Sequence, residues 1–430
     1  MAIKKRDRST LPKGMNEDLL REISKEYLLP LFSGASLDAS SERSSSSEAT
    51  VAYLSPQKIG FKVNKSDTYR LIFRRDQPFA KKKDPAREIR VVEAFSSILA
   101  EMNDELKGDL KGDLLSTFQR RLVARAVSEE SMEKNVLTLL DQMSSWSTRL
   151  YEGTPITGAI GIDPFAKTDT GIKFDLFASN DIGAVLSNGC NSMLAFDEGL
   201  SFIQHISLNH QVKTAPASPS MQSAISNWTA DREGRVAVAL NGYGELLVFR
   251  DGQLLFSRRN GIWHFLTHSP ILGQMAVPRD PKIRGAIYES ILDASFGRRG
   301  ACLGIVGSGQ RESWHSLVSE FDRLDLRISE KTKALGAVIQ KRPFHELNRT
   351  LREELLSIDG ATLLDHRGNV LAVGAVVRIS NTGDGGGRTS AAQGLARFGL
   401  GVKISQDGSI TGYRPTSSGS SEVAPAFRLM

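Results

Sequence analysis

The spacing of hydrophobic and polar residues changes several times along this chain, and each spacing predicts a different element. Apolar residues between Ile89 and Met102 recur every three or four positions after Asp84-Pro85, which predicts an amphipathic helix. Two apolar runs, GELLVFR and QLLFSRR, later meet at Asp251-Gly252, a dipeptide that favours a tight turn. We therefore expect these two runs to form a β-hairpin.

The last third of the chain mixes helical and strand-like spacing. ACLGIV, from Ala301 to Val306, is typical of a buried strand, and isoleucines at 283, 287 and 291 mark one face of a preceding helix. Apolar spacing predicts two more helices over 314–324 and 347–355, and turn residues predict hairpins over 361–379 and 402–414. Together these elements predict an α/β fold, with a mixed β-sheet flanked by helices.

A chain of 430 residues is too long for one ordinary core, so two or three domains are expected. Residues 1–49 are predicted to be a flexible segment, because 33–49 are Ser-rich and nearly free of large apolar groups. Residues 50–265 are predicted to form a separate α+β region, helical first and then β-rich. The α/β domain is expected over 266–415, followed by a disordered tail over 416–430, whose composition is that of a linker.

Composition narrows the class of protein. With 40% hydrophobic and 24% charged residues the chain is globular, and it lacks an apolar run of about 18 residues that could span a bilayer. Its first twenty residues lack the apolar centre of a signal peptide, so we expect a cytoplasmic protein. A net charge of +6 is mild at this length, and 7% aromatic residues argue against a nucleic-acid partner. The two cysteines and seven histidines show no zinc-ligand spacing.

The stretch NTGDGGGRTSAA, residues 381–392, is the first candidate for chemistry. Its glycines, Gly383, Gly385, Gly386 and Gly387, let the backbone lie directly against a ligand. Ser390-Ala391-Ala392-Gln393 fits a capping box, which predicts that a helix begins immediately after Arg388. A helix N-terminus beside a guanidinium favours an anion, so the stretch is typical of a phosphate cradle. A surface loop in which glycine only turns the chain explains the same residues equally well.

Asp359 is the second candidate. It lies between an amphipathic helix and an apolar strand, where a carboxylate can hold a divalent metal against phosphate oxygens and assist deprotonation of a hydroxyl. An aspartate at such a junction is also a common turn former, and taken alone that interpretation is the stronger one.

The order of these pieces resembles the diadenylate cyclase (DAC) domain, a family that condenses two ATP into cyclic di-AMP. The resemblance covers roughly residues 270–414. It rests on RRGACLGIV from Arg298, on Asp359-Gly360-Ala361 and the hairpin after it, on Gly386 to Ala392, and on ISQDGSI from Ile404.

The resemblance implies ATP binding with Mg²⁺ or Mn²⁺, the metal being held by Asp359, which would also help the attacking 3′-hydroxyl. It implies that Arg388 contacts phosphate. It further implies that the nucleotide site is formed by Gly360, Ala361, Gly386, Gly387, Arg388, Thr389 and Ser390. Because the product joins two ATP, the resemblance implies a homodimer with facing cyclase domains. The N-terminal region is then expected to be a sensor for an unknown ligand or protein, or else a scaffold.

The chain departs from the family pattern at three positions. Thr389 replaces a histidine, Ser390 an arginine, and Gln406 a glutamate. Because a phosphate-contacting arginine contributes strongly to phosphoryl transfer, activity is expected to be weakened, and a nucleotide-binding sensor module without turnover is the alternative. A third hypothesis, a dinucleotide-dependent oxidoreductase, rests on Gly304, Gly307 and Gly309, but these glycines occur in the wrong order for that fingerprint.

Overall fold

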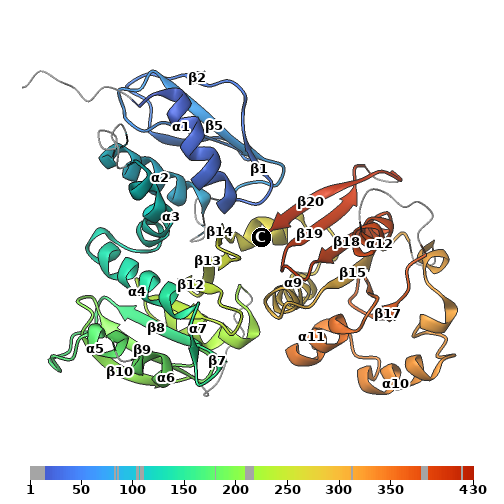
Figure 1. The fold of residues 1–430 in the computed structure, drawn as a ribbon. Helices are drawn as coiled ribbons and strands as arrows, with labels where there is room; N and C mark the ends of the chain where they lie inside the picture. Colours follow the sequence, from blue (N-terminus) through green and yellow to red (C-terminus); the bar gives the residue numbers. More distant parts are fainter. Residues whose placement is uncertain are drawn as a thin grey trace, which may run out of the picture.

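The computed structural model describes residues 15–81, 84, 87–102, 106, 111–179, 181–208, 217–310, 313–378, 386–417 and 420–430, without the side chains of 111–114 and 116. Within these ranges the chain forms sheets of five, seven, six and two strands, with helices packed against them (Figure 1). The predicted α/β class with a mixed sheet is confirmed.

The N-terminal part begins with α1 (Glu17–Ile23), a π-helical turn η1 (Ser24–Leu28) and a 3-10 turn η2 (Leu29–Leu31). An antiparallel sheet follows, in the order β1-β5-β4-β3, with β2 also paired to β5. Its strands are β1 (Ala35–Leu37), β2 (Glu42–Arg43), β3 (Val51–Ser55), β4 (Lys58–Phe61) and β5 (Tyr69–Arg75).

The Ser-rich segment is not a free linker. β1 and β2 both pair with β5, Arg70 forms ion pairs with Glu42 and Glu48, and the Lys62 ammonium donates to the Ser45 carbonyl. Backbone pairing needs no large apolar side chain, so the composition of 33–49 misled the prediction. Because β3, β4 and β5 precede the next helices, the order "helical first" is also wrong for 50–265. Residues 1–14 lie outside the described part of the chain.

Helices and a second sheet complete the N-terminal part. The helices are α2 (Glu88–Met102), α3 (Lys111–Val127), η4 (Glu130–Met132) and α4 (Glu133–Trp146), then α5 (Phe174–Ser179), α6 (Ile182–Leu186), η5 (Ser220–Gln222) and α7 (Ser223–Ala230). The sheet, in the order β10-β9-β8-β11-β12-β13-β14, contains β8 (Gly158–Asp163), β9 (Ser192–Asp197), β10 (Phe202–Ser207), β11 (Val236–Leu240), β12 (Leu246–Arg250), β13 (Gln253–Arg259) and β14 (Ile262–Phe265). A separate ribbon joins β6 (Leu150–Tyr151) to β7 (Thr154–Pro155). The predicted hairpin at Asp251-Gly252 is confirmed.

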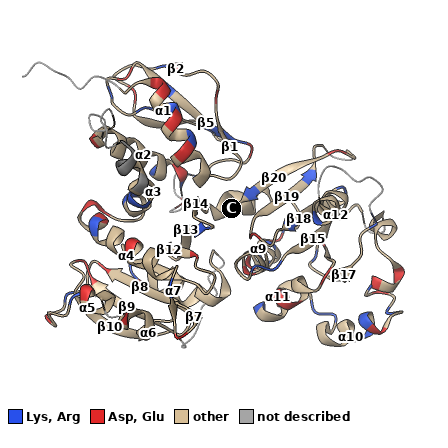
Figure 2. Ribbon diagram, in the orientation of Figure 1, with Lys and Arg blue, Asp and Glu red and all other residues tan. Residues whose placement is uncertain are grey.

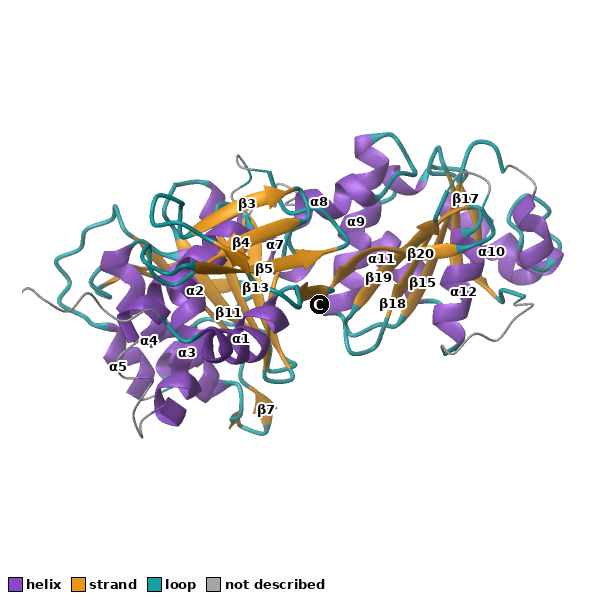
Figure 3. Cartoon of the chain, turned by 90° about the horizontal axis from the view of Figure 1, so that it is seen from above, coloured by secondary structure: helices purple, strands orange, loops and turns teal. Residues whose placement is uncertain are grey.

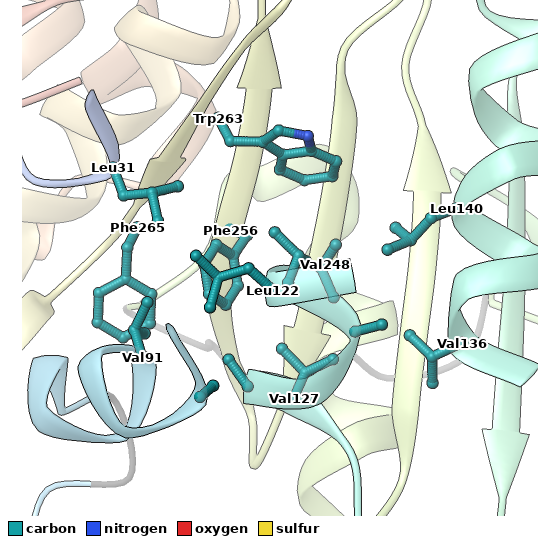
Figure 4. Packing of buried hydrophobic residues seen from close by; sticks show 14 of the residues in the cluster. Leu31, Val91, Leu122, Val127, Val136, Leu140, Val248, Phe256, Trp263 and Phe265 are labelled. Atoms are coloured by element: carbon teal, nitrogen blue, oxygen red, sulfur yellow. The ribbon is translucent and has the colours of Figure 1, made fainter. Parts of the chain in front are cut away.

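One hydrophobic cluster joins the two N-terminal sheets. Side chains from α2, α3 and α4 pack on one face of the seven-stranded sheet, and Figure 4 shows Leu122, Val136 and Leu140 facing Val248 and Phe256. Burial of these side chains fixes the helices against the sheet.

The C-terminal part contains α8 (His268–Gln274), α9 (Pro281–Phe296), η6 (Ser313–Leu317), η7 (Glu320–Asp322), α10 (Glu330–Ile339), η8 (Phe344–Glu346), α11 (Arg349–Ser357) and α12 (Gly387–Ala396). Its sheet runs in the order β17-β16-β15-β18-β19-β20. The strands are β15 (Ala301–Val306), β16 (Ala361–Asp365), β17 (Val370–Ala375), β18 (Gly399–Ile404), β19 (Ile410–Pro415) and β20 (Val423–Leu429). β15 and β16 are parallel and the other neighbours are antiparallel.

Helices cover both faces of this sheet. Figure 3 shows α12 on one side and α9 with α11 on the other. Residues alternate along β15 accordingly: Leu303 and Ile305 join the cluster with α9 and α11, whereas Cys302 and Val306 join the cluster with α12. β15 is therefore buried on both faces, as its continuous apolar run predicts.

Two predictions for the C-terminal part are wrong. Residues 314–324 form the short turns η6 and η7 instead of one helix, and Phe321, which lies within this stretch, is 63% exposed. The expected disordered tail contains β20, which pairs with β19 and buries Phe427 and Leu429. Its Ser/Gly-rich beginning hid the alternating apolar residues that follow.

Among the described residues no helix is both long enough and apolar enough to cross a bilayer. Figure 2 shows basic and acidic residues interspersed over both parts of the molecule. That distribution agrees with the mild net charge.

Candidate functional site

The turn between α11 and β16 holds Asp359 at the beginning of β16. Gly360 has φ +108°, and a Cβ on it would come within 2.5 Å of the Gly374 carbonyl carbon. Gly374 itself has φ +59°, and a Cβ there would meet the Asp359 carbonyl oxygen at 2.9 Å. Both glycines are thus required where the turn packs against the end of β17. The Asp-Gly-Ala sequence fixes the backbone of this turn as well as supplying a carboxylate.

The Asp359 side chain points into solvent. It is exposed, and its Oδ1 accepts a hydrogen bond from the N–H of the next residue, Gly360, at 3.1 Å. No ion pair joins Asp359 to another residue of the described ranges. The turn interpretation of Asp359 is therefore correct for its backbone, and its carboxylate is accessible to a ligand.

Arg388 lies in the first turn of α12, whose N-cap is Gly386. The expected capping box is wrong, because the helix begins at Gly387 and Ser390 is a buried residue of its first turn, 7% exposed. Apolar packing of the small residues after Ser390 against the sheet draws this side chain inward. Arg388 still lies at the positive end of the helix, although the helix itself begins about one turn earlier than predicted.

The guanidinium group of Arg388 lies directly over Gly300. A Cβ built on Gly300 would be 2.7 Å from Cζ and Nη1 of Arg388. Burial raises the pKa of the nearby Cys302 thiol to about 12, and the positive charge of Arg388 acts in the opposite direction. These contacts place the cation of Arg388 at the beginning of β15.

The register of β15 and β16 brings Asp359 to the same edge. Cys302 pairs with Ala361, so extending the parallel register by two residues places Gly300 opposite Asp359. Neighbouring strands lie about 4.8 Å apart. An anion lying on Gly300 and Arg388 would therefore have the Asp359 turn beside it. The extended register thus puts the Asp359 turn and Gly300, over which Arg388 lies, at the same end of this strand pair.

The glycine loop is described only in part. Gly383 and Gly385 lie outside the described residues, whereas Gly386 and Gly387 are exposed and a Cβ on either would meet nothing within 4 Å. Packing therefore does not require glycine at these two positions. Thr389 is half-buried, and the Gly386 carbonyl accepts a hydrogen bond from its N–H at 2.8 Å.

Sequence reasoning missed Arg298 and Gly300 as residues of this edge. Arg298 donates to the Asp407 carbonyl at 2.9 Å, which fastens the β18–β19 turn to the segment before β15. Gln406, in the same turn, is exposed. The sequence signal for both residues is the motif RRG directly before the strand, which enters the family resemblance only through its position in the order of motifs.

The donor set limits how a metal could bind. No group of three or more His, Cys, Asp or Glu residues able to hold a metal occurs in the described part of the chain. Mg²⁺ is commonly held by one or two carboxylates together with substrate phosphates. The accessible Asp359 carboxylate fits a cation that arrives with a triphosphate, and it does not fit a site made of protein ligands alone.

Two of the three glycines behind the oxidoreductase hypothesis, Gly304 and Gly307, have structural contacts in this domain. A Cβ on Gly304 would lie 3.0 Å from Leu395, and the N–H of Gly307 donates to the Phe398 carbonyl at 2.8 Å. Gly304 thus allows α12 to approach β15, and the structure offers no support for a dinucleotide loop here.

Cavities of about 450 and 390 Å³ occur near the opposite end of the parallel pair, beyond Val306 and Asp365. Neither is lined by Asp359 or Arg388. The candidate site is accordingly an exposed edge of the sheet.

Comparisons with known proteins add little. No family model and no curated protein matches the chain. Among solved structures, a double mutant of DacA from Staphylococcus aureus, a diadenylate cyclase, is similar with 14% sequence identity and a TM-score of 0.23; the match covers 34% of this chain and 86% of that one. This degree of likeness is too low to assign an activity to this chain.

Proposed function

We propose that this chain is a diadenylate cyclase that condenses two ATP into cyclic di-AMP and pyrophosphate. The observation that carries the proposal is the placement of Arg388 over Gly300, opposite the Asp359 turn in the register of β15 and β16. The Asp359 carboxylate and the Arg388 guanidinium are both exposed, so each is accessible to a ligand.

In this proposal the Arg388 fork binds phosphate oxygens, because a guanidinium matches their geometry and retains its charge. Asp359 would hold the Mg²⁺ or Mn²⁺ that accompanies the triphosphate and would accept the proton of the 3′-hydroxyl. The cation would neutralise charge on the phosphates. The 3′-oxygen of one ATP forms a bond to the α-phosphorus of the other, pyrophosphate leaves, and the step repeats to close the ring.

The exposed position of the site favours a homodimer. One chain binding one ATP cannot close a symmetrical product, so two edges must face each other across a two-fold axis. Apolar side chains near this edge are exposed: Ile358, the neighbour of Asp359, is 38% exposed, and Val376, directly after β17, is 73% exposed. Exposed apolar groups beside a binding site can be covered by another molecule, in this proposal the adenine ring or the second copy.

A nucleotide-binding module without turnover is the second candidate. The burial of Ser390 favours it, because a residue that faces the core cannot replace the lost arginine at a phosphate. Thr389 is left as the hydroxyl near Arg388, and Gln406 cannot act as a carboxylate.

Mass spectrometry of the products formed from ATP and Mn²⁺ by the full chain tests the proposal. We expect cyclic di-AMP from the wild type, none from Asp359→Asn, and wild-type yield from Glu354→Gln, an exposed carboxylate on α11. Absence of the product at concentrations where the protein is dimeric would refute the cyclase. Saturable ATP binding by calorimetry without product would then support the binding module.

A further inference from the structure

A cavity of about 590 Å³ lies in the N-terminal part, far in sequence from the candidate site. Its walls come from α3, the end of α4, the β11–β12 turn and the β13–β14 hairpin. Small-molecule sites commonly have volumes of about 300–1,000 Å³. Trp263, labelled in Figure 4, contributes an apolar wall and is 1% exposed.

Positive charge in this cavity is not fully balanced. Arg120 and Arg258 both line it, and its lining contains no aspartate or glutamate. Arg120 forms an ion pair with Asp141 at 2.6 Å, outside the lining, but no carboxylate of the described residues forms an ion pair with Arg258. Burial, and then the positive charge of Arg120, lower the pKa of Arg258. Two guanidinium groups therefore share a cavity with one counter-charge.

Polar groups that could orient a ligand surround Arg258. Its Nη1 donates to Ser144 Oγ at 3.1 Å, which holds the guanidinium in place without supplying a negative charge. Asn260 stands at the turn of the β13–β14 hairpin with φ +49°, and Gly244 closes another side with φ +74°. A Cβ on Gly244 would meet the Ser147 carbonyl at 3.1 Å, so glycine keeps this wall close to α4.

We propose that this cavity binds a small anionic metabolite, one that carries a phosphate or carboxylate group held by Arg258 and Arg120. An anion between two guanidinium groups supplies the missing counter-charge and forms charge-assisted hydrogen bonds. The exposed Tyr243 at the cavity wall offers a ring face to the rest of the molecule.

The cavity adjoins the contact between the N-terminal and C-terminal parts. Arg259, next to Arg258 on β13, pairs with the buried Glu245 at 3.1 Å, and Glu245 pairs with Arg298 at 2.6 Å. Tyr243 donates to the Gly297 carbonyl at 3.4 Å. Arg298 and Gly297 lead directly to Gly300, so a ligand here would regulate the cyclase edge; that consequence rests on the proposed function, whereas binding itself does not.

Binding is tested on the full chain by the melting temperature and by calorimetry, with inorganic phosphate and with malonate as separate probes and chloride balancing the ionic strength. We expect saturable stabilisation by at least one probe, and the preferred probe tells phosphate from carboxylate. Arg258→Gln, which can still donate to Ser144, should weaken binding at least about tenfold, the loss expected for a charge-assisted contact.

Two control variants make the result specific. Arg74→Gln removes a 57% exposed arginine that likewise contacts a serine hydroxyl, Ser36, on a different sheet, and it should bind as the wild type does. Arg388→Gln should also retain the response, which excludes phosphate binding at the cyclase edge.

If Arg258→Gln does not fold, Asn260→Asp replaces it. Aspartate tolerates the positive φ of this turn and places a negative charge at the cavity mouth, so it should weaken binding in the same direction. Stabilisation that rises without saturation, or binding unchanged in both the Arg258→Gln and Asn260→Asp proteins, would overturn the proposal.

Discussion

Arg388 of α12 occupies the space in which any side chain on Gly300 would lie. The two residues are 88 positions apart in sequence, and a Cβ on Gly300 would be 2.7 Å from the Arg388 guanidinium carbon. Glycine before β15 is therefore what allows the cation to reach the edge where Asp359 lies. The RRG motif before β15, which enters the family resemblance only through its order in the chain, therefore has a structural role: its glycine leaves room for the Arg388 guanidinium.

Replacing Gly300 by alanine should displace Arg388 without unfolding the domain, because the guanidinium is an exposed, flexible group. A misplacement of about 1 Å can lower the rate of a positioned reaction about 100-fold, so we expect a loss of that order in cyclic di-AMP formation, measured by mass spectrometry. Gly309→Ala is the matched control, since a Cβ there would meet nothing within 4 Å. Equal activity in the two variants would show that the position of Arg388 does not matter.

A second prediction concerns the packing of α12. A Cβ on Gly401 of β18 would overlap the Ala392 carbonyl oxygen, so Gly401→Ala must push α12 away from the sheet. Overpacking of this kind costs about 3 kcal/mol, which urea unfolding would detect. Gly394→Ala, within α12 and with open space around its Cβ, should instead stabilise by up to about 1 kcal/mol through helix propensity. If both variants unfold at the wild-type midpoint, α12 does not lie where the structure places it.

Local sequence patterns correctly predict the elements whose apolar periodicity is strong. The spacing of apolar residues predicts the strand over Ala301–Val306 and the helices over 88–102 and 281–296. It can do so because the residues buried on one face or on both faces recur at regular positions in the local sequence. The hairpin at Asp251-Gly252 follows from turn chemistry. Such features depend on neighbours in sequence.

The failures share a long-range cause. β1, β2 and β20 form strands because they pair with other strands of their sheets, and the amino-acid composition of a segment does not reveal such pairing. Local patterns pointed to Asp359 and Arg388 separately, and only the family resemblance put them in one site. The physical basis is long-range: the parallel register of β15 with β16 and the close approach of α12 to Gly300. Likewise, no local motif predicts the cavity around Arg258, whose walls come from four separate segments.

The third prediction tests the contact between the two parts of the molecule. Glu245 is 1% exposed and is the counter-charge of both Arg259 and Arg298, so Glu245→Gln leaves buried positive charge unpaired. We expect a loss of about 3 kcal/mol in the free energy of unfolding. A double-mutant cycle with Arg298→Gln should give a coupling of about 1 kcal/mol or more. Strictly additive losses would contradict the ion pair.

The last prediction is a pH dependence centred on His268, which joins β13 to α9. Its Nε2 donates to the Leu254 carbonyl at 2.8 Å and its Nδ1 accepts from the Tyr288 hydroxyl at 2.7 Å, an arrangement that suits the neutral ring. Burial lowers the pKa of His268 from about 6.5 to about 4. Below pH 6.5 the unfolded chain therefore binds a proton at this ring and the folded chain does not, so the free energy of unfolding falls as the pH drops through this window.

Between pH 7.5 and pH 5 the His268 ring should account for about 2 kcal/mol of lost stability, measured by urea unfolding at each pH. His268→Gln should make this slope shallower by that amount, whereas His205→Gln, which removes an exposed histidine, should keep it. Identical slopes in the two variants would show that His268 titrates normally in the folded protein.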